Sequence, residues 1–229
     1  MTRERYLSQL AELSAAVERM GQEVIRTIRV SIEALETLDV SVAQDLLANE
    51  ANVDSARHDI DEMAFLVIAT QQPTAIDLRL VLATANVAGE LERIGDYSAG
   101  IARLTLIMAG EPKGSPSPQI RRMADVTTGL LDKALGAFQE RDVEAASAVW
   151  RRDDEVDDLY QDFFRSQIEE MVNHRKRVRR GTYMLWVAHN IERMADRVTN
   201  IAEAVAFVVT ADVASWRGQL EAESVPAGH

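Results

Sequence analysis

The sequence predicts an all-α protein of six long helices, arranged as two pseudo-symmetric three-helix bundles. Glycine and proline are scarce, at 11 and 5 of 229 residues, while helix-favouring alanine, leucine, glutamate and arginine are abundant. Apolar residues recur at spacings of three and four, which is the period of an amphipathic helix. One segment also occurs twice: residues 91–102 and 191–202 share Glu-Arg-x-x-Asp followed by Ile-Ala. A repeat of this length indicates a duplicated domain.

The first repeat, residues 1–110, is expected to hold three helices. Residues 4–37 carry leucine, valine, isoleucine and methionine at helical spacing, which predicts one long helix. Asp39 or Ser41 is a suitable N-cap for a second helix over about 42–71, which Pro73 brings to an end. A third helix is expected over about 75–109, and it contains the first copy of the repeated segment.

A linker at residues 111–118 separates the two repeats, because glycine and proline crowd the stretch from 110 to 118. The second repeat, residues 119–213, is expected to hold helices over 119–139, 143–172 and 181–210, with a basic turn at 174–181. Trp150 and Trp186 are expected in the core. The tail, residues 214–229, is polar and is expected to be disordered.

Composition excludes several classes of function. The chain has no cysteine, so it forms no disulfide, thiolate zinc site or cysteine nucleophile. A formal net charge of −12 argues against a nucleic acid ligand and favours cations or basic partner surfaces. The charged N-terminus does not resemble a signal peptide, and the longest apolar run, 63–69, is too short to span a membrane. We therefore expect a cytoplasmic protein.

The repeated segments place pairs of carboxylates on one helix face, because residues four apart lie on neighbouring turns. Helices joined by short turns run antiparallel, and a rise of roughly 1.5 Å per residue puts an aspartate of each preceding helix nearly level with the pair. The result is three candidate carboxylates per repeat: Asp54, Glu92 and Asp96 in the first, and Asp157, Glu192 and Asp196 in the second.

Carboxylates gathered in this way repel one another unless a cation joins them. Oxygen donors suit magnesium, manganese, calcium or iron. Asn200 and Glu203 continue the second stripe at helical spacing, whereas Gly100 and Arg103 stand in the first, so the second site is expected to be the richer. A single Glu-x-x-x-Asp is a weak signal, and surface salt bridges are its simplest explanation. The duplication favours ion binding.

Other readings of the sequence are weaker. A ferritin-like di-metal bundle, for storage or oxidation of metal, needs Glu-x-x-His on two helices, and no histidine here has a glutamate three residues before it. No phosphate-binding glycine loop, serine nucleophile elbow or His-Glu-x-x-His occurs, so an enzyme is not expected. The basic run at 174–180 has two explanations: it balances helix ends, or it contacts an acidic partner or phosphate.

The sequence resembles the PhoU family, the accessory regulators of bacterial phosphate transport. The resemblance spans residues 5–210. It depends on the two Glu-Arg-x-x-Asp segments, on Asp77-Leu78-Arg79 and on the duplicated three-helix plan. It implies metal ions as cofactors, including multinuclear clusters, with iron or else manganese, magnesium or zinc as the metal. The implied ligands are Glu92, Asp96, Glu192 and Asp196.

The resemblance also implies a regulatory role. Family members are thought to connect a phosphate ABC transporter, at the inner face of the membrane, to a phosphate-responsive sensor histidine kinase. They repress the starvation response when phosphate is plentiful. We accordingly expect a metal-binding negative regulator of phosphate uptake and signalling, acting as a homo-oligomer, most simply a dimer. The motifs concern the bundle and its metal, so regulation of a different anion transporter stays open.

Overall fold

The computed structural model describes residues 3–110 and 117–224, and these form an all-α fold with no strand in either range. Most of the predicted linker, 111–116, lies outside the described residues. The first half contains α1 (Arg3–Thr37), α2 (Val40–Ala48), α3 (Glu50–Gln71) and α4 (Ala75–Met108). The second contains α5 (Pro118–Glu140), α6 (Val143–Trp150), α7 (Asp154–Asn173), a 3₁₀ turn (Arg175–Arg177) and α8 (Val178–Thr210), followed by α9 (Val213–Ser224).

The two halves begin their second helices in the same way. Asp39 accepts hydrogen bonds from the backbone N–H groups of Ser41 and Val42 at the start of α2, and Asp142 accepts one from Ala145 at the start of α6. These caps satisfy donors that the first helical turn leaves unpaired. The duplicated Asp-Val sequence therefore performs the same local function twice.

Two of the six predicted long helices are interrupted, which corrects the expected spans 42–71 and 143–172. The first breaks at Asn49, whose side-chain amide donates to the carbonyl of Asp45 at 2.7 Å, and the second breaks over 151–153. Asparagine and aspartate side chains compete for backbone groups and so favour helix ends. The apolar period continues across both breaks, which is why spacing alone predicts continuous helices.

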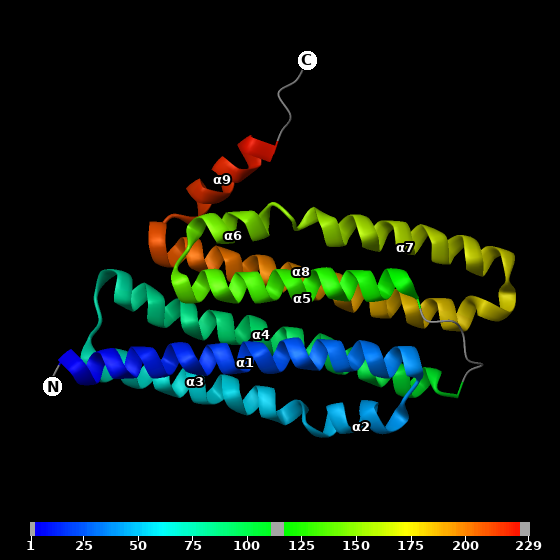
Figure 1. The fold of residues 1–229 in the computed structure, drawn as a ribbon, viewed down its shortest axis with the longest axis horizontal. Helices are drawn as coiled ribbons and strands as arrows, with labels where there is room; N and C mark the ends of the chain where they lie inside the picture. The colour runs from blue at the N-terminus through cyan, green and yellow to red at the C-terminus, as the bar shows by residue number, and fades with distance from the viewer. Residues whose placement is uncertain (1–2, 111–116, 225–229) are drawn as a thin grey trace, which may run out of the picture.

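The long helices of the two halves pack side by side in Figure 1, with α4 and α8 in contact at the centre. Their buried faces belong to one continuous hydrophobic core that also takes in α1, α3 and α5. The two repeated segments are 100 residues apart in the chain, and their contact is symmetric: position 200 meets position 90, and position 190 meets position 100. Asn200 reaches Glu90, and Asn190 lies so close to Gly100 that an added Cβ would be 2.9 Å from its Nδ2. Glycine permits the second approach because it has no side chain.

The C-terminal segment differs from the expected disordered tail. Residues 213–224 form α9, while 225–229 lie outside the described residues. Trp216 and Leu220, four residues apart, are buried, and the Trp216 indole N–H donates to Ser147 Oγ at 3.0 Å. Trp150 packs edge-on against the Trp216 ring at 6.3 Å and is half-buried, whereas Trp186 is exposed, contrary to its expected place in the core.

No single helix within the described ranges has the length and apolarity needed to cross a membrane. Among the described residues, one pair of helices meets those criteria together: α8, counted from the 3₁₀ turn, and α9, which are bent by 118° relative to each other.

Candidate metal centre

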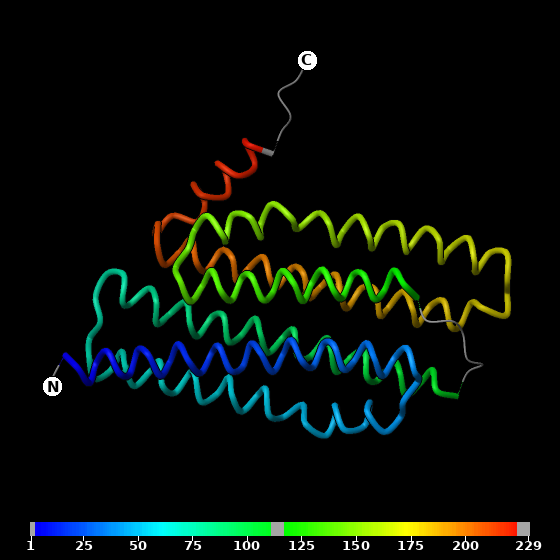
Figure 2. Tube along the Cα trace, in the orientation of Figure 1, coloured from blue at the N-terminus to red at the C-terminus, as the bar shows by residue number. Residues whose placement is uncertain are grey.

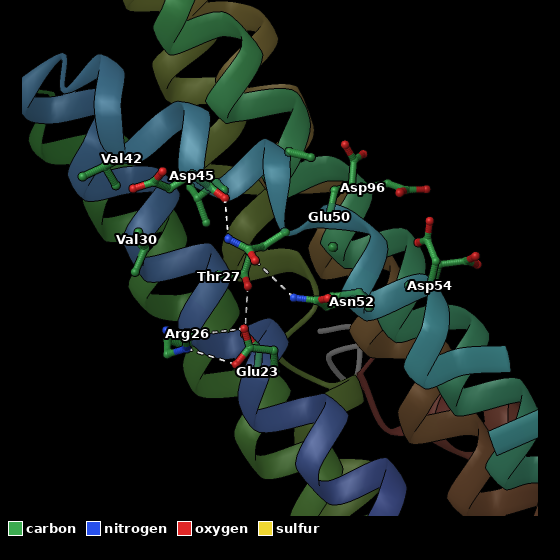
Figure 3. Close-up of a pocket in the computed structure, with 16 residues that line it drawn as sticks. Glu23, Arg26, Thr27, Val30, Val42, Asp45, Glu50, Asn52, Asp54 and Asp96 are labelled. Atoms are coloured by element: carbon green, nitrogen blue, oxygen red, sulfur yellow. Dashed lines mark hydrogen bonds and ion pairs between the residues drawn. The ribbon is translucent and has the colours of Figure 1, made fainter. Parts of the chain in front are cut away.

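Four carboxylates gather in the first half, where α3 begins beside the middle of α4. Figure 3 shows Glu50, Asp54 and Asp96 together at one edge of a cavity of about 320 Å³. Glu92 also lines this cavity. Partial desolvation raises the pKa of Asp96, and the charges of Glu92, Asp54 and Glu50 raise it further, while Arg103 opposes them. The four side chains therefore lie close enough to repel one another.

The second half repeats this arrangement where α7 begins beside α8. Desolvation raises the pKa of Asp157 and of Glu192, and the charge of Asp196 adds to both shifts. Desolvation also raises the pKa of Asp153, reinforced by Asp157 and Asp196, although the hydroxyl of Thr199, which donates to Asp153 at 2.8 Å, acts in the opposite direction. This cluster is also a set of mutually repelling carboxylates.

The structure places Asp54 beside the Glu92–Asp96 pair of α4 and Asp157 beside the Glu192–Asp196 pair of α8. The helical rise per residue predicts this placement. Two further members of the clusters, Glu50 and Asp153, are not identified from the sequence. Each stands four residues before its aspartate, so each of the four chain segments at these sites carries an acid-x-x-x-Asp. The signal was present in the sequence: Glu50 and Asp153 are separated by the same 103 residues that separate Asp54 and Asp157.

Asn200 and Glu203 do not join the second cluster, which corrects their predicted role. Asn200 Nδ2 donates to Glu90 Oε2 at 3.1 Å, and Glu203 forms an ion pair with Arg217 of α9. Both line another cavity, of about 390 Å³, between α4 and α8. Thr199 of α8 pairs with Asp153 just before α7, so the turns of α8 after Thr199 lie past the start of α7. There Asn200 faces α4 and Glu203 faces α9.

Basic side chains occupy part of each carboxylate cluster. Arg57 contacts Glu92 at 2.6 Å and Arg103 contacts Glu50 at 2.6 Å. In the second cluster Arg193 contacts Asp196 at 2.7 Å. His189 Nδ1 lies 3.2 Å from Glu192 Oε2, yet that buried oxygen accepts no hydrogen bond from residues 3–110 or 117–224. An orphaned buried carboxylate oxygen indicates a place where a cation would be favoured.

The donor chemistry and the geometry give different answers about a metal ion. Carboxylate oxygens in this number suit a hard or borderline cation. However, in the part of the chain that the structure describes, no three histidine, aspartate or glutamate side chains converge closely enough to hold one ion together. The residues therefore fit a metal by type, and binding requires their side chains to rotate away from the arginine partners.

The helical arrangement and the repeated clusters can be compared with known proteins. The PhoU domain family matches residues 17–105 and 120–205, which together cover most of the chain and one segment of each half. The chain belongs to the PhoU family. The ferritin-like reading is accordingly set aside.

Relatives of this PhoU-family chain extend over almost its full length. A phosphate-specific transport system accessory protein PhoU homolog from Caulobacter vibrioides is 34% identical, over 94% of this chain and 95% of the relative. A PhoU homolog of the same description from Clostridium acetobutylicum is 32% identical, over 92% and 96%. The crystal structure of PhoU from Pseudomonas aeruginosa is 27% identical with a TM-score of 0.85, and covers 90% of this chain and 99% of that one.

Proposed function

We propose that this chain is a metal-binding adaptor that restrains a phosphate ABC transporter and the sensor histidine kinase of the phosphate-starvation response. Its relatives are named as accessory proteins of the phosphate-specific transport system, which supports the phosphate side of the proposal. The role proposed is regulatory and not catalytic. The proposed working form is a homodimer in the cytoplasm, at the inner face of the membrane.

The observation that carries the metal proposal is the double arrangement of the carboxylates. Each half brings two acid-x-x-x-Asp pairs, one from each of two neighbouring helices, to the same level of the bundle. A bound cation would relieve the repulsion that, after desolvation, helps to raise the pKa of Asp96, Asp157 and Glu192. The residues that would hold metal in the two halves are Glu50, Asp54, Glu92 and Asp96, and Asp153, Asp157, Glu192 and Asp196.

The direct test is metal content per chain in protein purified without chelators or an affinity tag. It compares the unmodified chain with a variant in which Glu92, Asp96, Glu192 and Asp196 are replaced by alanine. The matched control replaces Asn200 and Glu203, which lie in the neighbouring cavity. We expect stoichiometric iron, manganese, magnesium or zinc in the unmodified and control chains and its loss in the fourfold variant.

Two results would reject the metal proposal: negligible metal in the unmodified chain after soaking with each ion, or unchanged metal in a fourfold variant that stays helical. The regulatory proposal is tested separately, in cells from which the gene for this chain has been deleted. We expect phosphate uptake and a starvation-response reporter to stay active at high phosphate, and complementation to restore repression. Normal repression without the chain would contradict it. Sedimentation velocity measures whether the chain is a dimer.

A further inference from the structure

The hairpin formed by α7, the 3₁₀ turn and α8 extends beyond the rest of the molecule. In Figure 1 and in the trace of Figure 2 its tip lies past the ends of α1 and α5. Residues 164–180 contain no buried side chain, and the buried residues that flank them are Phe163 and Gly181. This part of the hairpin contributes little to the hydrophobic core, so core packing does not explain which residues it exposes.

The tip is basic, although the chain as a whole is acidic. Residues 164–180 hold six arginine or lysine side chains and two glutamates, a formal net charge of +4, which leaves −16 on the rest of the chain. Five of the six cations lie within 175–180. Arg177 pairs with Glu170, and the guanidinium of Arg179 stacks on the Tyr183 ring at 5.8 Å. The corresponding turn of the first half, residues 71–74, carries no charged residue.

Exposed apolar side chains accompany these cations along both helices of the hairpin. On α7, Phe164, Ile168 and Val172 are spaced by four, so they follow one face towards the tip, where Val172 is 75% exposed. On α8, Val178 is exposed immediately beside the turn, and Trp186 is 54% exposed two turns further on. The Trp186 ring packs against Tyr183 at 5.9 Å. Val172 and Val178 therefore lie on either side of the 3₁₀ turn, Arg175–Arg177.

We propose that this hairpin tip docks onto the surface of a bilayer that contains anionic phospholipids. The arginine and lysine side chains would contact the lipid phosphates, while the flanking valines would enter the headgroup layer. Tryptophan and tyrosine prefer that boundary because one end of each ring is apolar and the other polar. An acidic protein surface would complement only the positive charge of the tip. An anionic bilayer complements both that charge and the exposed apolar side chains beside it.

Charge also sets the orientation of this contact. The remaining −16 is repelled by an anionic surface, so attraction is confined to the tip. Because the clusters of carboxylates lie near the starts of α3 and α7, away from the tip, docking does not cover them. The inference is independent of the metal proposal.

The test is sedimentation of the full chain with vesicles, using an equal mixture of phosphatidylcholine and phosphatidylglycerol and, in parallel, pure phosphatidylcholine. We expect binding to the anionic vesicles only, together with a blue shift of tryptophan emission that Trp186→Phe removes. Each cation near an anionic surface changes partitioning by about fivefold, so Arg175→Gln with Lys176→Gln is expected to lower it roughly 25-fold. Val172→Ser with Val178→Ser is expected to weaken binding at unchanged charge.

The matched control is Arg122→Gln with Lys133→Gln, which removes the same charge from two exposed positions on α5. This control should bind like the unmodified chain, and circular dichroism should show that every variant is helical. Equal loss in the tip and control variants would mean general charge attraction and would overturn the proposal. Failure of the unmodified chain to bind anionic vesicles would also overturn it, and would leave an acidic protein surface as the partner of the tip.

Discussion

Replacing Glu90 by alanine is expected to destabilise the contact between the two halves. Glu90 is 4% exposed on α4, an unusual environment for a carboxylate. It accepts hydrogen bonds from Arg93 at 2.5 Å and from Asn200 of α8 at 3.1 Å, and Arg197 of α8 lies 3.5 Å away. The side chain thus connects two helices that belong to different halves of the chain.

The expected loss in the free energy of unfolding depends on how far Arg93 and Arg197 are buried once they have lost the Glu90 carboxylate. Removing one partner of a fully buried ion pair costs about 3–5 kcal/mol. Here Arg197 is 19% exposed and Arg93 is 54% exposed, so water compensates much of the lost interaction. We expect about 2–3 kcal/mol for Glu90→Ala. For a chain of this size that corresponds to a fall in Tm of roughly 4–12 °C. Glu90→Gln keeps the shape and should cost less.

The assay is urea unfolding followed by far-ultraviolet circular dichroism, with chelator present in every sample. The control is Glu23→Ala, because Glu23 and Arg26 form a pair with the same spacing of three but on an exposed surface. Such a pair contributes at most about 0.5–1 kcal/mol. Equal effects of Glu90→Ala and Glu23→Ala would refute the reasoning, because burial would then make no difference to the energy of the interaction.

Three further outcomes are expected. Trp216→Ala removes a buried indole worth about 3 kcal/mol of packing, so α9 should detach and limited proteolysis at residues 211–212 should accelerate, while Trp186→Ala should leave that rate unchanged. Burial and the hydrogen bond to Asp77 raise the pKa of Tyr6 to about 12 from 10.0, so stability should fall as pH rises between these values, and absorbance titration of Asp77→Asn should show a lower tyrosine pKa. Because the folded state raises the pKa of Glu192, its charge opposes folding at neutral pH, and Glu192→Gln should raise the Tm of the metal-free chain; a lower Tm would contradict this.

Much of the fold is predictable from local sequence. The apolar period defines the long helices, and the duplicated Asp-Val caps mark where α2 and α6 begin. The breaks at Asn49 and over 151–153 are missed because they last only a few residues and do not disturb the apolar period. The helix α9 is missed for a related reason: two buried residues, Trp216 and Leu220, are too few to stand out in a polar segment.

The candidate site is predictable to the extent that it depends on spacing within a helix. Acids four residues apart share a face, so the pairs on α4 and α8 follow from sequence alone. The roles of Asn200 and Glu203 depend on which neighbouring helix each side chain of α8 faces: Asn200 faces Glu90 of α4, and Glu203 faces Arg217 of α9. Periodicity along one helix contains no information about its neighbours.

The sequence by itself determined the helical class, the duplication and the carboxylate pairs. The apolar period indicates helices, the repeat is found by comparing two segments of the chain, and the paired acids are only four residues apart. Only the tertiary structure decided that Glu50 and Asp153 complete the clusters and that arginines share them. It also decided that Glu90 connects the halves and that a basic, apolar hairpin tip stays outside the core. These features depend on the rotation and relative position of packed helices, which burial of the whole core fixes at once.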